Sequence, residues 1–238
     1  MSTLINLFRA GNWQELAVIL SVRIFTVFCV LPIHEYAHAL AAHRLGDETA
    51  RLAGRLTIRP TAHLHPIGTV MILLFGMGFA NPVPVNPNNF RMRNKKAGFA
   101  LTAAAGPLSN LIMALFWYFL TNLLYFIGAK TGTSSSILWI AVMFMYYAGS
   151  INVALAVFNL IPIPPLDGSR LLTAVLPDRI YYKIMRYERY IMIGLMVLLF
   201  VRVLDVPLSF LNGVISRGFI LFTGLPFGTG SSLVGLFG

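Results

Sequence analysis

Residues 16–44 read LAVILSVRIFTVFCVLPIHEYAHALAAHR, and this stretch decides the fold. A bilayer crossing takes about 20 apolar residues, and this run is long enough while carrying the pattern His-Glu-x-x-His from His34 to His38. On a helix that spacing puts both imidazoles one turn apart on one face, able to bind one zinc ion with Glu35 beside them. Solvated histidines at a polar helix end are the alternative, which leaves the spacing to chance. The stretch predicts a membrane helix that ends in a metal site.

The composition extends this prediction to the whole chain of 238 residues. It is 57% hydrophobic and 11% charged, with a mean hydropathy of +0.76, whereas a soluble domain is about 45–50% apolar and roughly a quarter charged. We expect an all-α polytopic membrane protein with about five or six transmembrane helices and no separate soluble domain. It would form one domain over 1–238, with a catalytic core at about 14–170 and C-terminal membrane helices at about 188–225.

The charge pattern sets the expected orientation. The formal net charge is +10, but the basic residues adjoin apolar runs, which favours a membrane and no nucleic acid as the partner. Thirteen of the 18 fall in three stretches: Arg44, Arg51, Arg55, Arg59; Arg91, Arg93, Lys95, Lys96; and Arg170, Arg179, Lys183, Arg186, Arg189. The positive-inside bias makes these stretches cytoplasmic. We therefore expect a multi-pass protein of a bacterial or archaeal plasma membrane, with His34 and His38 nearer the cytoplasmic face.

A catalytic zinc needs a third protein ligand and one open position. Cys29 is the only cysteine, so the ligands must be histidines and carboxylates. Most carboxylates lie in polar or basic stretches where solvated surface is the ordinary interpretation: Glu15, Asp47, Glu48, Asp178 and Glu188. Asp167 differs, because prolines at 162, 164 and 165 stop a helix before it and Gly168 permits a tight turn that aims it inward. Asp167 is the predicted third ligand.

The region between the first helix and the next long apolar run has a different character. Residues 46–65 suit a short cytoplasmic strand or loop, and His63 and His65 within it are loop histidines or a gate. Ile67 to Ala80 is short for a straight span and suits a re-entrant or hairpin element. The segment from Asn81 to Pro87 cannot be helix.

That segment, NPVPVNP, has a pattern of its own. Prolines at 82 and 84 remove donors from one side of an extended chain, so the side with Val83 and Val85 can pair with an extended substrate. We predict an edge strand here; the alternative is a proline-rich loop that turns the chain. The glycine-rich tail after Pro226 predicts a poorly ordered end.

Four elements resemble, in order, the site-2 protease family of intramembrane zinc metalloproteases, peptidase family M50. They are His34 to His38, Asn81 to Pro87, the run GPLSN at 106–110, and NLIPIPPLDG at 159–168. The last matches the family signature N-x-x-P-x-P-x-L-D-G without departure. The length leaves no room for PDZ or CBS modules, so the chain looks like the compact form.

The resemblance implies a ligand set and a reaction. His34, His38 and Asp167 would bind one zinc ion per chain, Glu35 would act as general base and acid, and Asn159 would bind the scissile carbonyl or its oxyanion. Asn110 would be a neighbour of the active site that contacts substrate. The expected function is an intramembrane metalloendopeptidase that cleaves transmembrane-helix proteins in the lipid bilayer. A zinc carrier without protease activity and an inactive scaffold are the alternatives; the sequence does not decide the oligomeric state.

Overall fold

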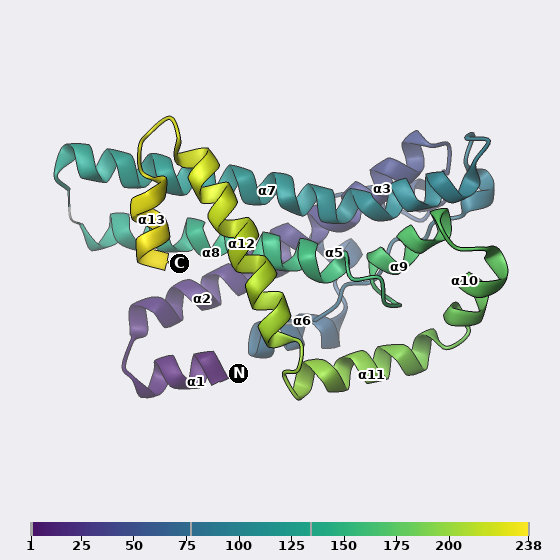
Figure 1. Cartoon of the computed structure of the whole chain (residues 1–238), viewed down its shortest axis with the longest axis horizontal. Coiled ribbons are helices and arrows are strands. Elements are labelled where there is room, and N and C mark those ends of the chain that lie inside the picture. Colours follow the sequence, from purple (N-terminus) through teal and green to yellow (C-terminus); the bar gives the residue numbers. More distant parts are fainter. Residues whose placement is uncertain (1, 77, 134, 238) are drawn as a thin grey trace.

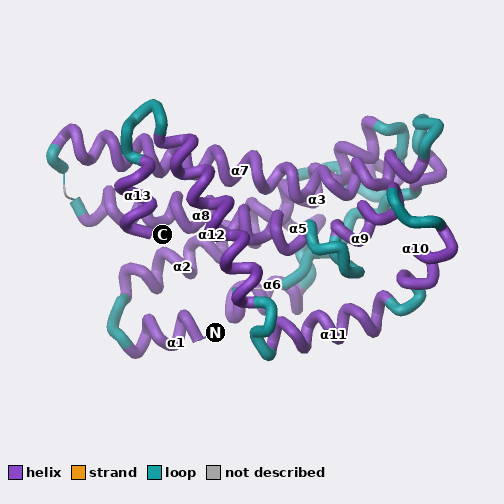
Figure 2. The backbone as a smooth tube through the Cα atoms, viewed as in Figure 1, coloured by secondary structure: helices purple, strands orange, loops and turns teal. Residues whose placement is uncertain are grey.

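The computed structural model describes residues 2–76, 78–133 and 135–237, and within these ranges it contains helices and loops but no strand (Figure 2). The helices are α1 (Ser2–Arg9), α2 (Trp13–Phe25), the π-helix η1 (Thr26–Val30), α3 (Leu31–Arg44), α4 (Thr49–Leu52), α5 (Pro60–His63), α6 (Pro66–Phe75), the 3-10 helix η2 (Pro87–Asn89), α7 (Lys95–Thr131), α8 (Ser136–Asn159), α9 (Asp167–Leu171), the 3-10 helix η3 (Leu172–Ala174), α10 (Asp178–Met185), α11 (Glu188–Phe200), α12 (Asp205–Gly224) and α13 (Gly230–Phe237). The all-α prediction is confirmed for the described residues.

Four helices are long and apolar enough to cross a membrane: Trp13–Arg44, Lys95–Thr131, Ser136–Asn159 and Asp205–Gly224. The expected count of five or six spans is therefore not confirmed, since the described residues offer four candidates. The difference lies in two short elements. With 10 and 13 residues, α6 and α11 measure about 15 and 20 Å at 1.5 Å per residue, whereas the hydrocarbon core is about 30 Å thick.

The first span is one continuous helix of 32 residues that joins α2, η1 and α3. Pro32 explains the π-helical turn in its middle, because a proline offers no N–H and its ring crowds the carbonyl four residues earlier. The chain accommodates it with a wider turn, in which the Leu31 N–H bonds to the Thr26 carbonyl, five residues back. Turns of this type occur often at functional sites, and this one immediately precedes His34.

The central layer consists of α7 and α8, which run side by side, with α3 against the first half of α7 and α12 crossing both (Figure 1). Small residues permit the close approach. A Cβ on Gly149 of α8 would lie 2.8 Å from the ring of Tyr118, which is fully buried on α7. Tyr118 belongs to a cluster with Val153 and Ile220 that joins α7, α8 and α12.

The apolar run after α5 folds back on itself. Gly76 ends α6 in the left-handed conformation (φ +80°), and the chain returns until the Asn81 N–H bonds to the His63 carbonyl at 2.7 Å. Residues 66–85 are called the α6 hairpin below. Its returning arm, which includes Asn81 to Val85, has no regular secondary structure, so the predicted edge strand is not formed. Residues 46–65 likewise form the short helices α4 and α5 instead of a strand.

The C-terminal tail is ordered as α13, which corrects the expectation of a poorly ordered end. Leu233 is fully buried, and the ring of Phe237 stacks on Tyr146 at 4.0 Å between centroids while its carbonyl accepts the Tyr146 hydroxyl at 3.1 Å. Aromatic stacking of this kind stabilises contacts beyond their buried area. The composition predicts disorder because the tail is rich in glycine, whereas its order depends on two residues, Leu233 and Phe237.

Candidate metal centre

The structure brings His34 and His38 of α3 together with Asp167, the first residue of α9. The three donor atoms form a nearly equilateral triangle: His34 Nε2 lies 3.2 Å and His38 Nε2 3.1 Å from Asp167 Oδ2, and the two nitrogens are 3.1 Å apart. Both histidines are buried and Asp167 is nearly so. These three side chains, the donor triangle, form the one group of potential metal ligands found among the described residues.

The dimensions of the triangle fit a small tetrahedral cation. Zinc bonds of about 2.0–2.1 Å to nitrogen and oxygen give a tetrahedron with edges of about 3.3 Å, close to the three observed separations. The hydrogen bonding of His38 also fits a bound cation. His38 Nδ1 lies 2.8 Å from the Thr102 carbonyl, which can only accept, so a neutral ring keeps the lone pair on Nε2. That lone pair faces a carboxylate oxygen, an arrangement that a shared cation stabilises.

A glycine on α7 makes room for the donors. A Cβ on Gly106 would lie 2.6 Å from His34 Nε2 and closer still to His38 Nε2. Glycine is therefore the residue that leaves this space open. His34 Nδ1 is buried and has no hydrogen-bond partner among the described residues, unlike His38 Nδ1.

The loop before α9 delivers Asp167 to the two histidines. Residues 160–166 leave α8 through a series of turns, and Gly168 packs so closely against them that a Cβ would lie 2.5 Å from the carbonyl carbon of Leu160. Burial raises the pKa of Asp167, but hydrogen bonds from His34 and His38, when these rings carry the proton, lower it more, so the pKa lies well below its usual range. A cation bound between the three side chains would take the place of those ring protons.

Glu35 lies between the two histidines in sequence and turns toward the α6 hairpin. Its Oε2 accepts the main-chain N–H of Val83 at 3.2 Å, and the Val83 side chain is buried against Ala39 and Ala50. The sequence does not predict this contact, although its one signal is Val83, which keeps an N–H between Pro82 and Pro84.

The two predicted amides differ in position. Asn159 is the last residue of α8 and its Nδ2 donates to the Leu155 carbonyl of its own helix at 2.9 Å. Asn110 follows Gly106 by four residues, so both lie on one face of α7. Asn110 is fully buried, and neither Nδ2 nor Oδ1 has a hydrogen-bond partner among the described residues.

The remaining histidines lie outside the donor triangle. His63 is fully buried and Nε2 donates to the Thr57 carbonyl at 2.7 Å. His65 caps α6, since its Nδ1 accepts the Gly68 N–H at 3.4 Å. His43 pairs with Glu48 at 3.1 Å on the surface.

Asp47 is a carboxylate that the sequence analysis misplaced. It is fully buried rather than solvated, and its oxygens accept four hydrogen bonds from Thr49, Asn86 and Asn89. It joins the loop after α3 to η2, so its role is structural.

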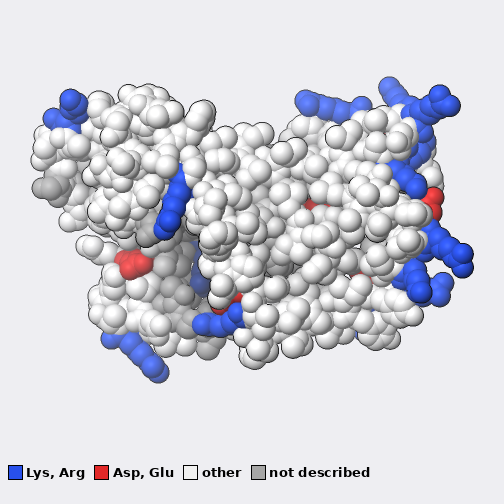
Figure 3. All heavy atoms as spheres, in the orientation of Figure 1, with Lys and Arg blue, Asp and Glu red and all other residues white. Residues whose placement is uncertain are grey.

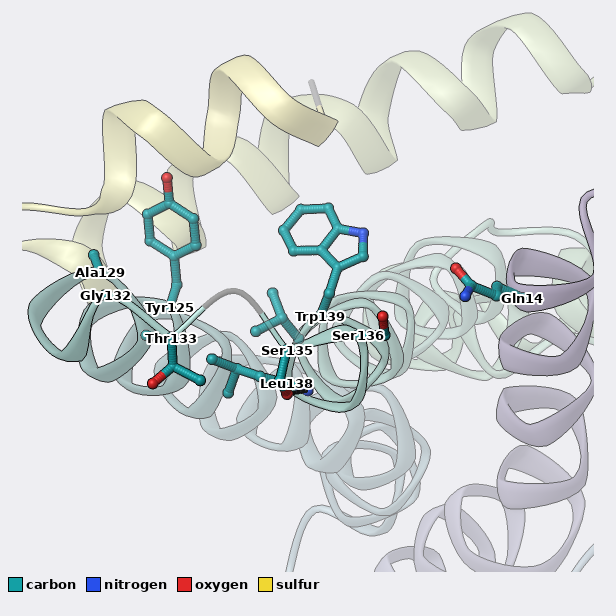
Figure 4. Close-up of a pocket in the computed structure, with 11 residues that line it drawn as sticks. Gln14, Tyr125, Ala129, Gly132, Thr133, Ser135, Ser136, Leu138 and Trp139 are labelled. Carbon is teal, nitrogen blue, oxygen red and sulfur yellow. Dashed lines mark hydrogen bonds between the residues drawn. The ribbon is translucent and has the colours of Figure 1, made fainter.

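The basic side chains and a pocket lie at opposite ends of the molecule. Lys and Arg gather at the end where α3 stops and α10 lies (Figure 3). A pocket of about 520 Å³ lies instead at the α7–α8 turn, where Tyr125 and Trp139 point toward the C-terminal helices (Figure 4). Gly128 in its lining is 22 residues along α7 from Gly106, about 33 Å, so this pocket is remote from the donor triangle.

Comparison with known sequences shows which family this chain resembles. Residues 22–201 match the model of peptidase family M50. YwhC of Bacillus subtilis, named as a candidate zinc metalloprotease, is 38% identical over 182 residues, which are 74% of this chain and 78% of that protein. Rip2 of Mycolicibacterium smegmatis, named in the same way, is 30% identical over 143 residues, 58% of this chain and 51% of that protein. No solved structure matches significantly.

Proposed function

The chain belongs to peptidase family M50 and is a zinc-dependent metallopeptidase, and from that premise we propose that it cleaves membrane proteins within or near their transmembrane segments. The observation that carries this proposal is the position of the donor triangle. Two of its members lie on the 32-residue apolar helix Trp13–Arg44, and Gly106, which makes room for them, lies on the candidate span Lys95–Thr131. A peptidase centre built on such helices is suited to substrates that are themselves in the bilayer.

The proposed centre lies nearer the cytoplasmic face. His34 is 21 residues from Trp13, about 32 Å along the helix, but only 10 residues, about 15 Å, from its basic end at Arg44. The basic end in Figure 3 belongs on the cytoplasmic side by the positive-inside bias. Cleavage would then release a product toward the cytoplasm.

We assign one zinc ion to the donor triangle, held by His34, His38 and Asp167. When bound, zinc in a site with three protein ligands lowers the pKa of a coordinated water to about 7 and polarises a carbonyl. Thr102 fixes the ring and tautomer of His38 through its carbonyl. The zinc-carrier alternative is not favoured by the family match.

Glu35 is the proposed proton carrier. As general base it would take a proton from the attacking water, and as general acid it would return that proton to the leaving amine. Asn159 would turn its Nδ2 from the Leu155 carbonyl to the developing oxyanion. Asn110, with two unpaired polar atoms, would hydrogen-bond to substrate backbone.

The substrate must expose a carbonyl that a helix keeps in its own hydrogen bonds. We propose that an unwound substrate lies along the returning arm of the α6 hairpin and pairs with Val85. Val83 lies beside it but directs its N–H to Glu35. The partners are thus the bilayer and a transmembrane-helix protein, and no nucleic acid is required.

The decisive experiment replaces Glu35 by Gln in the detergent-purified full chain. A panel of fluorogenic peptides, each with one apolar segment interrupted by a different helix-breaking pair, supplies the substrate. We expect wild type to cleave members of the panel, Glu35→Gln to lose at least about 1,000-fold in rate, and both to retain one zinc. The surface variant Glu48→Gln is the matched control and keeps full activity. Cleavage by Glu35→Gln, or none by wild type, contradicts the proposal.

A further inference from the structure

The α6 hairpin is a stiff element whose two arms are closely packed. Gly68 on α6 touches Phe79 on the returning arm so closely that a Cβ would collide with the Phe79 backbone. Asn81 ties the end of that arm to the start of α6, because its Nδ2 donates to the Leu64 carbonyl at 3.0 Å in addition to its main-chain bond. The ring of His65 packs on Phe79 with 4.8 Å between centroids. The hairpin therefore moves, if at all, as a unit.

Arg23 holds the turn of this hairpin. From α2, fifty residues away in sequence, its Nη1 donates to the carbonyls of Leu73 and Leu74 at 2.8 and 2.9 Å. The last carbonyls of a helix have no partner within it and carry the negative end of its dipole, so a guanidinium there is well placed. A charged residue within a membrane span is costly, and this contact accounts for its presence.

The other end of the hairpin reaches the catalytic helix at Glu35. Within the described part of the chain, the Val83 N–H is the one hydrogen-bond donor to the Glu35 side chain, at 3.2 Å. Val83 itself is 5% exposed and wedged against Ala39 and Ala50. A carboxylate has two oxygens, and a bond that fixes Oε2 leaves Oε1 to exchange a proton. The α6 hairpin thus links Arg23, which bonds to the carbonyls of Leu73 and Leu74, to Glu35, which accepts the N–H of Val83.

We propose that Val83 is a positioning residue that holds Glu35 through its main-chain N–H, and that Arg23 maintains this contact by fixing the turn of the α6 hairpin. The inference rests on the proposed function, because it gives Glu35 a task in the reaction. It gives the Val83 N–H a partner other than substrate, and it gives Arg23 a role that its position in the sequence does not suggest. Held in this way, Glu35 keeps one geometry through successive reaction cycles.

The test removes the N–H of Val83 in two ways, of which one also keeps the valine side chain. Val83→Pro lacks the donor, and the neighbours Pro82 and Pro84 already exclude helix there. Val83→Ala is the matched control, because it keeps the N–H and loses the side chain. A second variant replaces the amide of Val83 by an ester, using the α-hydroxy analogue of valine, and loses only the N–H. Zinc per chain is measured for each.

We expect Val83→Pro and the ester to lower kcat by about 10- to 100-fold, as the loss of a group that orients a catalytic residue does, with KM within about twofold and zinc unchanged. Val83→Ala should lower kcat less than the ester does, because it keeps the N–H. Arg23→Gln should lower kcat less, and the double variant Arg23→Gln/Val83→Pro should be no slower than Val83→Pro alone, since both act through one contact.

Three outcomes overturn the inference. A raised KM with unchanged kcat in the ester variant means that this N–H serves the substrate. Equal losses in Val83→Ala and the ester mean that packing is what matters, and additive losses in the double variant mean that Arg23 acts by another route. The proposed function has its own test: cleavage by Glu35→Gln removes it, whereas an inactive Glu35→Gln with wild-type kcat in the ester removes only the inference made here.

Discussion

Two buried asparagines on α7 have opposite environments. Asn122 Nδ2 donates to the carbonyls of Tyr118 and Ile220 and to the hydroxyl of Thr223, and its Oδ1 accepts the hydroxyl of Thr229 at 2.6 Å. Asn110 lies 12 residues earlier, about 18 Å along the helix, and is equally buried but has no partner for either polar atom among the described residues. One amide is fully used by the fold and the other is not used by it at all.

The contrast separates structural from functional polarity. A satisfied buried amide stabilises the contact it makes, whereas an unsatisfied polar group costs about 1–3 kcal/mol and persists where another requirement keeps it. Asn122 joins α7 to α12 and to the residue before α13, a region mostly beyond the family match at residue 201. Asn110 lies one turn from Gly106 and the donor triangle. On the proposed function, the first half of α7 would serve the reaction, whereas the hydrogen bonds of Asn122 hold the second half of α7 to α12.

The largest effect should come from the donor triangle itself. Asp167→Ala removes one of three ligands, and we expect zinc per purified chain to fall from about one to near zero, with peptidase activity at least about 1,000-fold lower. The fold should survive, because removing the Asp167 carboxylate also relieves the crowding among the three donor atoms. Metal analysis and cleavage of the reporter panel measure both. Asp178→Ala, which removes an exposed carboxylate paired with Lys96 at 2.8 Å, is the control. Full zinc in Asp167→Ala contradicts the ligand assignment.

The two asparagines give the direct test of the comparison. Asn122→Leu removes four hydrogen bonds, to two carbonyls and two hydroxyls, and we expect a loss of about 2–4 kcal/mol in stability with unchanged activity per folded molecule. Asn110→Leu replaces an unsatisfied amide by an apolar side chain of similar size, so the melting temperature should hold or rise while kcat falls by about 100-fold. Melting curves and kinetics in one detergent separate the two. If the two variants changed the melting temperature and kcat to the same extent, the two halves of α7 would not differ in role.

Sequence reasoning predicted the elements that depend on periodicity and motif. The three residues of the donor triangle and the long apolar helix over residues 16–44 followed from spacing, proline and length. The long helices at 95–131 and 136–159 are two of the membrane helices that the apolar composition predicts. Each of these features is encoded within a short stretch, which one sequence is sufficient to reveal.

What the sequence could not reveal depends on residues far apart. Arg23 had no explanation until α6 was seen to end beside it, and Asp47 looked solvated because its partners Asn86 and Asn89 are about forty residues away. The predicted edge strand is not confirmed, because a strand needs a partner strand and Val83 on the returning arm packs against Ala39 and Ala50 of helices α3 and α4. Asn110 and Asn122 look alike in sequence, since both are amides in apolar helix.

A smaller effect is expected at Gly106. Gly106→Ala places a methyl group against both histidines, 2.6 Å from His34 Nε2 before relaxation, and we expect zinc affinity to fall by about 10- to 100-fold. Gly213→Ala on α12 is the control, because a Cβ there meets nothing within 4 Å, and alanine favours a helix by about 1 kcal/mol over glycine. Competition with a chelator of known affinity gives the ratio. An unchanged affinity would show that the donors do not need the space that Gly106 leaves.

The smallest effect is expected at Asp47, which lies outside the membrane helices. Like Asn122 it is buried with all its polar atoms hydrogen-bonded, but it carries a charge. Burial raises its pKa, but the bonds from Thr49, Asn86 and Asn89 lower it more, so the pKa in the folded chain lies below the value of about 3.9 in an unfolded one. Such a group stabilises the fold above the unfolded pKa, and its contribution is lost as pH falls through the folded pKa. Asp47→Asn should therefore cost about 1–3 kcal/mol at pH 7, and the difference from wild type should shrink below about pH 4. Melting temperatures of both proteins with zinc removed by a chelator measure this, because neither then depends on the donor triangle. A difference that does not change with pH would mean that the shape of Asp47, and not its charge, holds the two loops together.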